Sequence, residues 1–293
     1  MADEQEDESG GAATEGGADI ADIARAGEPD RYLAALLTPA PQRQALLALA
    51  AFATELARIP RRAVREPFMG EVRLQWWRDA LARPEAESAG HAVADGVRRA
   101  ARRHGLPAAL LGGMIDARGA ELLAAPFHDD AALYDFLQRS EGAHFALACR
   151  VTGFGVRPDV EAASATAGRA YGLARLLLGL PRSLALGRVP LAHTRIAAAG
   201  LTAQDLLAGA GGDKAEALVR AYIAQIRGSL AEARGLARAL PRPARTAFLP
   251  LALVGSYVRV LERQGSEALR AAPEIVPLTR VWKVGMAHLL GRP

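Results

Sequence analysis

Apolar residues recur at helical spacing along most of the chain. Between residues 213 and 240, for example, Leu218, Tyr222 and Ile226 stand four residues apart. This spacing places their side chains on one face of an α-helix. No stretch alternates apolar and polar residues over the length of a strand, and Val, Ile and Thr are scattered. The pattern therefore predicts an all-α protein.

Prolines and short polar stretches divide this pattern into helices, because proline interrupts the hydrogen bonding of a helix. The segment from Gly187 to Gly200 lacks the helical pattern and is predicted to be a loop. No linker is long or polar enough to divide residues 28–293, which are predicted to form one helical bundle. The predicted helices run from Asp30 to a stop at Pro39, and over Ala45–Ile59, Met69–Leu81, His91–His104, Pro107–Leu123, Ala131–Phe154, Val160–Leu184 with a break near Gly179, Asp213–Leu240, Phe248–Leu261 and Pro277–Leu290.

The N-terminal segment differs in composition from the rest of the chain. Residues 1–27 are acidic, rich in Gly and Ala, and without aromatic residues. Such a segment buries too little apolar surface to offset the entropy lost on ordering. We predict that residues 1–27 are a disordered acidic tail, with at most a short helical turn near Ile20–Arg25.

Charge is unevenly distributed. The first 30 residues hold ten acids and one base, which leaves 35 bases and 22 acids, a net charge of +13, for the remainder. A body of this charge suits diphosphates, anionic lipid or nucleic acid, although a solvated arginine-rich surface is the favoured explanation. The basic helix around Arg98, Arg99, Arg102 and Arg103 carries no aromatic residues that would stack on bases, so a solvated face is expected there and nucleic acid is not expected as a partner.

Several chemical classes lack their signatures. Cys149 is the single cysteine and lies in an apolar helix, so we expect a buried thiol and no disulfide. No HExxH, P-loop or GxGxxG motif is present, which argues against a histidine metal site and a nucleotide cofactor. No apolar run reaches the roughly 18 residues that span a bilayer, and the acidic start is unlike a targeting peptide. We therefore expect a cytoplasmic protein, with peripheral contact to the inner membrane face left open.

Three blocks of the sequence carry a family resemblance. The first is LALAAFATELARIPRR with RLQWWRDAL, which includes Ala51-Phe52 and Trp77-Arg78; the second spans Asp116 to Gly142. The third is GRAYGLARLLLGLPRSLALGRVPL, which includes Gly187-Arg188. In order and spacing these blocks resemble the squalene/phytoene synthase family. The resemblance implies the helical class I isoprenoid synthase fold and, in active members, magnesium-dependent condensation of prenyl diphosphates.

The resemblance also identifies four altered positions. Active members carry two DxxxD motifs whose carboxylates hold magnesium diphosphate. The matching residues here are Ala57 and Arg61 in the first motif, and Gly179 and Ser183 in the second. None of them is a carboxylate, so the resemblance implies that no metal is held there, because magnesium requires oxygen ligands. Candidate ligand-binding residues, each also consistent with a structural role, are Arg58, Trp77, Arg78, Tyr171, Arg175 and Arg188.

These departures resemble a subgroup of the family that includes the mitochondrial assembly factor for respiratory complex I and its bacterial relatives. The subgroup implies a non-catalytic protein without cofactors that supports assembly or stability of a membrane respiratory complex. Its partners would be subunits or assembly proteins of that complex. The alternative is a prenyltransferase or prenyl-diphosphate-binding protein, in which arginines such as Arg58 and Arg175 neutralise the diphosphate directly; only a transferase would need magnesium.

Overall fold

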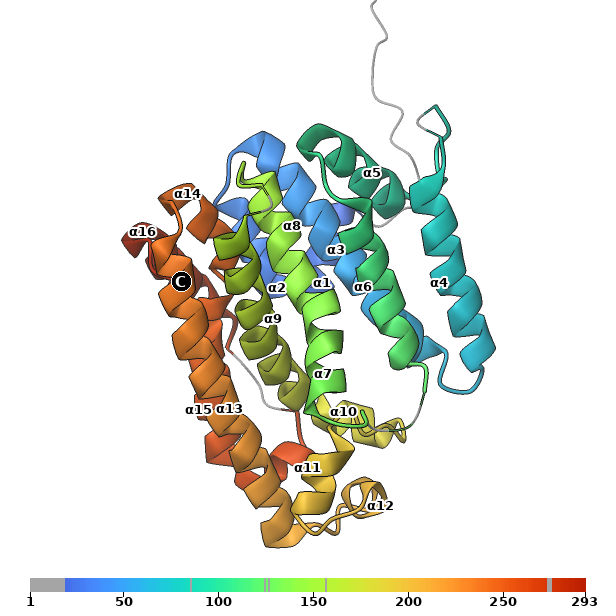
Figure 1. The fold of residues 1–293 in the computed structure, drawn as a ribbon, viewed down its shortest axis with the longest axis vertical. Helices are drawn as coiled ribbons and strands as arrows, with labels where there is room; N and C mark the ends of the chain where they lie inside the picture. The colour runs from blue at the N-terminus through green and yellow to red at the C-terminus, as the bar shows by residue number, and fades with distance from the viewer. Residues whose placement is uncertain (1–18, 85, 124, 126, 156, 273–275) are drawn as a thin grey trace, which may run out of the picture.

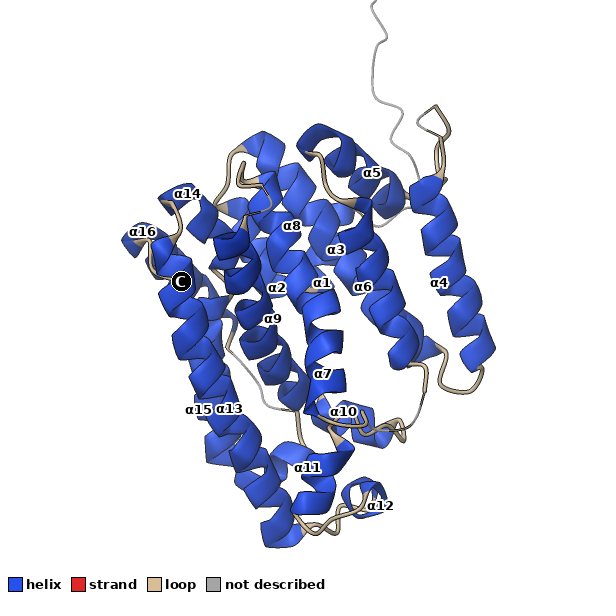
Figure 2. Cartoon of the chain, in the orientation of Figure 1, coloured by secondary structure: helices blue, strands red, loops and turns tan. Residues whose placement is uncertain are grey.

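The computed structural model describes residues 19–84, 86–123, 125, 127–155, 157–272 and 276–293. Figure 2 shows helices throughout this part of the chain, with no strand. A single bridge between Phe127 and Ala192 is the one β-type pairing in it. The predicted all-α fold is therefore confirmed.

The helices form one bundle (Figure 1). Their bounds are α1 Ile20–Gly27, α2 Pro29–Leu36, α3 Ala40–Arg62, α4 Pro67–Ala82, α5 Ala92–His104, α6 Ala108–Ala120, α7 Asp130–Leu137, η1 Gln138–Gly142, α8 Ala143–Val151, α9 Pro158–Leu178, α10 Leu180–Ala185, α11 His193–Ala198, α12 Ala203–Leu207, α13 Gly212–Ala239, α14 Arg242–Arg245, η2 Thr246–Phe248, α15 Leu251–Gln264, η3 Gly265–Leu269 and α16 Pro277–Leu290.

Helix α9 is the centre of the bundle. It packs against α13, α15, α8 and η1, and Figure 1 shows it between the α7–α8 column and the α13–α15 pair. Its buried face is built from small residues such as Ala163, Ala167, Gly168 and Gly172, which let neighbouring backbones come close. A Cβ placed on Gly168 would lie 2.4 Å from the backbone nitrogen of Gly142. The backbones of α9 and η1 are therefore in direct contact.

The segment η1 is a π-helical turn between α7 and α8, so the predicted helix Ala131–Phe154 is continuous but locally widened. The hydroxyl of Ser140 donates a 2.7 Å hydrogen bond to the carbonyl of Phe136 within this turn. Such turns insert one extra residue per helical turn and often occur at functional sites. Here the turn carries Glu141, whose side chain is buried.

Proline positions explain where the predicted helix bounds were wrong. Pro41 lies in the first turn of α3, where a missing N–H leaves no bond unmade, so the helix begins at Ala40. Pro60 lies in the last turn, and α3 continues past it to Arg62. The predicted loop Gly187–Gly200 contains the short helix α11. The predicted break near Gly179 is present, between α9 and α10.

The N-terminal helix α1 extends the packed body beyond the sequence-based boundary. Residues 1–18 of the predicted disordered tail lie outside the described residues. Asp19 caps α1, Ala24 is fully buried, and α1 packs on α3. A Cβ on Gly27 would lie 2.2 Å from Cγ2 of Thr54, so the end of α1 touches α3. The full helix was missed because the acidic, Gly- and Ala-rich composition of residues 1–27 outweighed the helical spacing of Ile20, Ile23 and Ala24.

Two further expectations can be compared with the structure. Arg98 is not a solvated surface cation: it is buried and donates hydrogen bonds to the carbonyls of Arg83, Pro84 and Glu87. Cys149 is buried as expected, and burial raises the pKa of its thiol to about 12.

One stretch of the described chain, residues 242–264, is long and apolar enough to cross a bilayer. Because 67% of its most apolar window is buried, this stretch reads as a core helix.

Candidate functional site

A cavity of about 330 Å³ lies between the C-terminal end of α3, the end of α6, and the junction of α9 with α10. All four altered motif positions line it. Ala57 and Arg61 come from the last turns of α3, while Gly179 and Ser183 flank the start of α10. The structure therefore brings the two motif regions, more than 100 residues apart in the chain, onto one cavity, which we call the central pocket.

Three of the six candidate ligand-binding residues belong to this region. Arg175 and Arg188 line the central pocket. Arg188 also donates to the backbone carbonyl of Glu121, which ties the loop after α10 to the end of α6. Tyr171 is buried one turn before Arg175 on α9, and its ring lies 5.3 Å from the guanidinium carbon of Arg175.

The other three candidates lie elsewhere. Arg58 pairs with Glu55 at 2.5 Å on the side of α3 that faces α4. Trp77 is buried beside Phe52, with ring centroids 5.1 Å apart, and does not line the central pocket. Arg78 bridges α4 to α6 through Asp116 at 2.8 Å. None of the three lines the central pocket, and Arg58 and Trp77 line a separate hollow between α3 and α4.

Three glutamates that the sequence did not single out also line the central pocket. They are Glu28, between α1 and α2, Glu121, at the end of α6, and Glu141, in η1. Carboxylates that converge on a cavity are what a magnesium site requires. Whether these three glutamates could bind a metal ion depends on the hydrogen bonds and ion pairs that their carboxylate oxygens already form.

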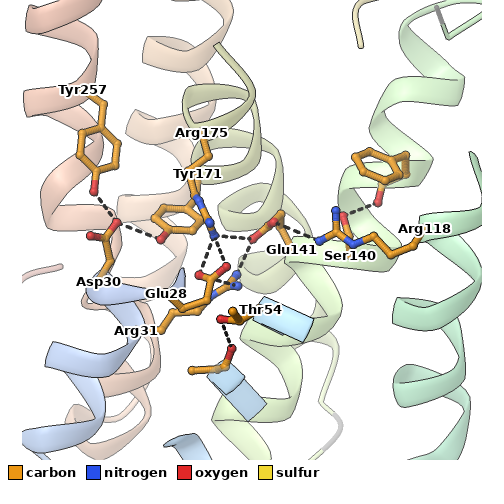
Figure 3. Close-up of polar contacts among 12 residues, drawn as sticks. Glu28, Asp30, Arg31, Thr54, Arg118, Ser140, Glu141, Tyr171, Arg175 and Tyr257 are labelled. Atoms are coloured by element: carbon orange, nitrogen blue, oxygen red, sulfur yellow. Dashed lines mark hydrogen bonds and ion pairs between the residues drawn. The ribbon is translucent and has the colours of Figure 1, made fainter. Parts of the chain in front are cut away.

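Each of these glutamates is bound by arginine, and Figure 3 shows this for Glu28 and Glu141. Glu28 accepts from Arg31 at 3.1 Å and from Arg175 at 2.6 Å. Glu141 pairs with Arg31, and with Arg175 at 3.8 Å and Arg118 at 4.0 Å. Arg118 also donates to Glu121 at 2.6 Å. Within the described residues no group of three or more His, Cys, Asp or Glu side chains is arranged to hold a metal ion.

The donor set therefore does not fit magnesium. A divalent cation at this place would have to displace guanidinium groups from buried carboxylates, and it would meet the positive charge of Arg61 at the old motif position. Two like charges in a partly buried cavity repel each other strongly. The arginines take the charge-balancing position that a metal would otherwise fill. We call the residues Glu28, Arg31, Arg118, Glu141 and Arg175 the buried charge network.

A further buried carboxylate, Asp30, joins the network to the C-terminal helices. It accepts hydrogen bonds from the hydroxyls of Tyr171, at 2.9 Å, and Tyr257 (Figure 3). Arg280 of α16 lies 3.4 Å from its other oxygen. Burial and the charge of Asp30 raise the pKa of both tyrosines, so both hydroxyls stay protonated as donors. This cluster fixes α2 against α9, α15 and α16.

The central pocket as a whole has excess positive charge. Five arginines and three glutamates line it, and the glutamates are already paired. Arg61 and Arg182 lie at its exposed edge, and neither forms an ion pair with a carboxylate in the described part of the chain. Burial and the charge of Arg182 lower the pKa of Arg61. The arrangement can hold an anion, but its carboxylates are paired with arginines and are not free to bind a metal ion.

The buried network makes stability depend on pH in a defined direction. Burial would raise the pKa of Glu141, but the charges of Arg31, Arg175 and Arg118 outweigh burial and lower it from 4.5 to about 2. A carboxylate with a lowered folded-state pKa stabilises the fold at pH values above its ordinary pKa. We expect this contribution to be complete above about pH 4.5 and lost as the pH falls towards 2.

Urea unfolding followed by circular dichroism across that pH range checks the expectation. Glu141→Gln should be less stable than the wild type at pH 7, and the difference should shrink towards pH 2. Glu267→Gln, which removes an exposed carboxylate, is the control and should show neither effect. A difference between Glu141→Gln and the wild type that stays constant with pH would contradict the assignment.

Comparisons with known proteins agree with this fold. Two curated relatives are named NADH dehydrogenase (ubiquinone) complex I, assembly factor 6. The one from Bos taurus is 26% identical over 245 residues, which cover 83% of this chain and 72% of the relative. The one from Homo sapiens is 24% identical over the same shares.

Solved structures show the same architecture. A dehydrosqualene synthase in complex with ligand matches with a TM-score of 0.72 at 14% identity, covering 91% of this chain and 94% of that chain. The squalene synthase HpnC from Alicyclobacillus acidocaldarius matches with a TM-score of 0.68 at 18% identity, over 84% and 92%. At these identities the likeness shows the fold alone. The family model for squalene/phytoene synthase matches residues 24–282. The chain therefore belongs to the squalene/phytoene synthase family.

Proposed function

We propose that this protein is a non-catalytic member of its family that supports assembly or stability of a membrane respiratory complex of the complex I type. The observation that carries the proposal is the state of the central pocket. Its four motif positions supply no carboxylate, and its three glutamates are held by arginines. A pocket built in this way lacks the metal ligands on which the family chemistry depends.

The chemical step explains why this matters. Prenyl condensation begins when an allylic diphosphate ionises, and the departing pyrophosphate gains negative charge. Magnesium bound by carboxylates neutralises that charge. Arginines can bind a diphosphate through charged hydrogen bonds, but they do not bridge it as a divalent cation does. The pocket therefore favours holding an anion over activating it.

The two curated relatives support the direction of the proposal, because both are named as assembly factors of complex I. By the same reasoning, the partners are subunits or assembly proteins of the respiratory complex. The protein would work on the cytoplasmic side, in peripheral contact with the inner membrane face.

A deletion strain tests this function. We expect loss of NADH:quinone reductase activity with normal isoprenoid content, and recovery when the wild-type chain is supplied. Normal reductase activity combined with loss of an isoprenoid product would overturn the proposal. Supplying Arg61→Ala/Arg182→Ala in the same strain separates a role of the central pocket from a role of the outer surface. Failure to restore the reductase activity would indicate the pocket, and full recovery would indicate the outer surface.

One observation favours a second candidate function, the binding of prenyl diphosphate without turnover. Arg61 and Arg182 lie together at the mouth of the central pocket, and neither forms an ion pair with a carboxylate among the described residues, although the charge of Glu121 acts on Arg61. Arg175 is less suited to a ligand, because Glu28 already binds it at 2.6 Å. A diphosphate would relieve the repulsion between the two outer arginines.

A thermal-shift titration with farnesyl diphosphate checks this candidate. We expect stabilisation that does not depend on magnesium, and binding at least about tenfold weaker in Arg61→Ala/Arg182→Ala, because each charged hydrogen bond contributes about 1.5–3 kcal/mol. Arg62→Ala is the matched control, since Arg62 is exposed on the same helix end but lines a different hollow. No stabilisation at any ligand concentration, or an equal loss in the control, would exclude the arginine site.

A further inference from the structure

Exposed apolar side chains gather on the last helix. Eleven large apolar residues are exposed in the described part of the chain, and six of them lie between residues 276 and 290. In α16 the exposed fraction is 74% for Leu278, 68% for Trp282 and 71% for Leu289. Scattered single residues of this kind are ordinary, but a cluster on one helix marks an interaction surface.

Four of these exposed residues share one face of α16. At 100° per residue, Leu278, Val281, Trp282 and Leu289 fall within an arc of about 100°. The opposite face is docked on the protein: Val284 and Ala287 are buried, and Arg280 reaches Asp30. The helix is thus held rigidly in place with its apolar face turned outward.

Basic residues lie at the C-terminal end of α16 and on the segments next to it. Figure 1 shows α16 beside α14 at one end of the bundle. Arg242 and Arg245 of α14 donate to the carbonyls of Leu289 and Gly291 at the end of α16. Burial and the charges of Arg259 and Arg234 lower the pKa of Lys283. The segments 233–261 and 276–293 contain eight Arg and Lys residues and no Asp or Glu.

We propose that α16 is a membrane-binding element that inserts its apolar face into the interfacial region of an anionic lipid bilayer. Helices that lie in a membrane interface combine an apolar face that bears Trp and Leu with flanking Arg and Lys. Tryptophan favours the boundary between lipid headgroups and acyl chains, and anionic headgroups complement the surrounding bases. The proposal deepens the proposed peripheral location and rests on it, because it assigns the surface that makes the contact.

Two other occupants match this surface less well. A second copy of the chain would use the same patch on both subunits, and its basic rim would face an identical basic rim. The acidic residues 1–18 suit the rim by charge, but they include no large apolar residue besides Met1 and cannot cover Trp282. A bilayer offers an apolar region for the exposed face of α16 and anionic headgroups for the basic residues.

Vesicle flotation tests the proposal with the full chain. We expect the wild type to bind vesicles of phosphatidylcholine with phosphatidylglycerol, and to bind phosphatidylcholine alone more weakly. Leu278→Ser/Trp282→Ser/Leu289→Ser should weaken binding at least about tenfold, since each side chain loses its transfer to an apolar environment. The matched control is Phe68→Ser/Met69→Ser/Val72→Ser, which changes the exposed apolar residues at the start of α4 and should bind as the wild type does.

Trp282 supplies a second readout, because lipids with brominated acyl chains quench only tryptophans that enter the bilayer. Quenching should appear in the wild type and vanish in Trp282→Phe. A wild type that binds neither kind of vesicle would overturn the peripheral location together with the surface. Equal binding by the wild type and the α16 variant, or loss of binding in the α4 variant alone, would overturn only the assignment to α16. A change from dimer to monomer in the α16 variant, measured by sedimentation velocity without vesicle binding, would assign the face to a second copy.

Discussion

Replacing Arg31 with methionine is expected to lower the free energy of unfolding by about 3–5 kcal/mol, because it leaves buried carboxylates without their partner. Arg31 is buried and pairs with both Glu28 and Glu141. Its guanidinium carbon also lies 5.3 Å from the ring centre of Tyr171. Methionine keeps much of the volume but removes the charge, so the loss reports the buried charge network and not a cavity.

Urea unfolding followed by circular dichroism measures this effect. Arg25→Met is the matched control, because Arg25 pairs with Asp22 on the same N-terminal segment with more than half of each side chain exposed. Exposed pairs contribute about 0–1 kcal/mol, so the control should change stability little. A loss for Arg31→Met no larger than that of the control would mean that the buried charge network does not hold the fold together.

Replacing Gly168 with alanine should cost about 3 kcal/mol or prevent folding, since overpacking a tight contact costs about 1–3 kcal/mol and occasionally more. The added Cβ would lie 2.4 Å from the nitrogen and 2.6 Å from the Cα of Gly142. Both are backbone atoms and cannot rotate away. The substitution would push α9 from η1 and separate Glu141 from Arg175.

Gly228→Ala, on the neighbouring helix α13, is expected to have the opposite effect and to raise the stability of the fold. Gly228 lies within α13, and a Cβ there would meet nothing within 4 Å. Alanine should stabilise this helix by about 0.5–1 kcal/mol. Thermal unfolding of both variants decides the matter: Gly168→Ala as stable as Gly228→Ala would contradict the close approach of α9 and η1.

The helical fold could be predicted because its signals are local. Apolar spacing gave α5, α13 and α16 to within about a residue at each end, and the break between α9 and α10 followed from Gly179 and Pro181. Errors occurred where one residue type has two roles. Proline ends a helix in its interior but begins one in the first turn, so α3 starts earlier than Pro41 suggested.

The candidate site was only partly visible in the sequence. The family resemblance pointed to Ala57, Arg61, Gly179 and Ser183, and these residues do line one cavity. Nothing local indicated that Glu28 would meet Arg175, 147 residues away. The available signal was Glu141, the acid that stands nearest the apolar run Phe145–Cys149 in the predicted helix Ala131–Phe154. An ionisable residue in such a place requires a buried partner, but the sequence does not name it.

The candidates that lie away from the central pocket have a similar explanation. Trp77 and Arg78 fit the family pattern, yet the structure uses them to join α4 to α3 and to α6. A motif match identifies a helix more reliably than the direction of its side chains, because adjacent residues point about 100° apart. For the same reason the exposed face of α16 was not predicted. Its bounds were predicted correctly, but the side on which it packs against the bundle was not.

The release of pyrophosphate from farnesyl or geranylgeranyl diphosphate, measured with magnesium present, tests the central claim most directly. Because the carboxylates of the central pocket are bound by arginine, we expect no release above the background without protein. Release at about 1 s⁻¹ or faster, a typical enzyme rate, that stops when a chelator removes the metal would contradict the account.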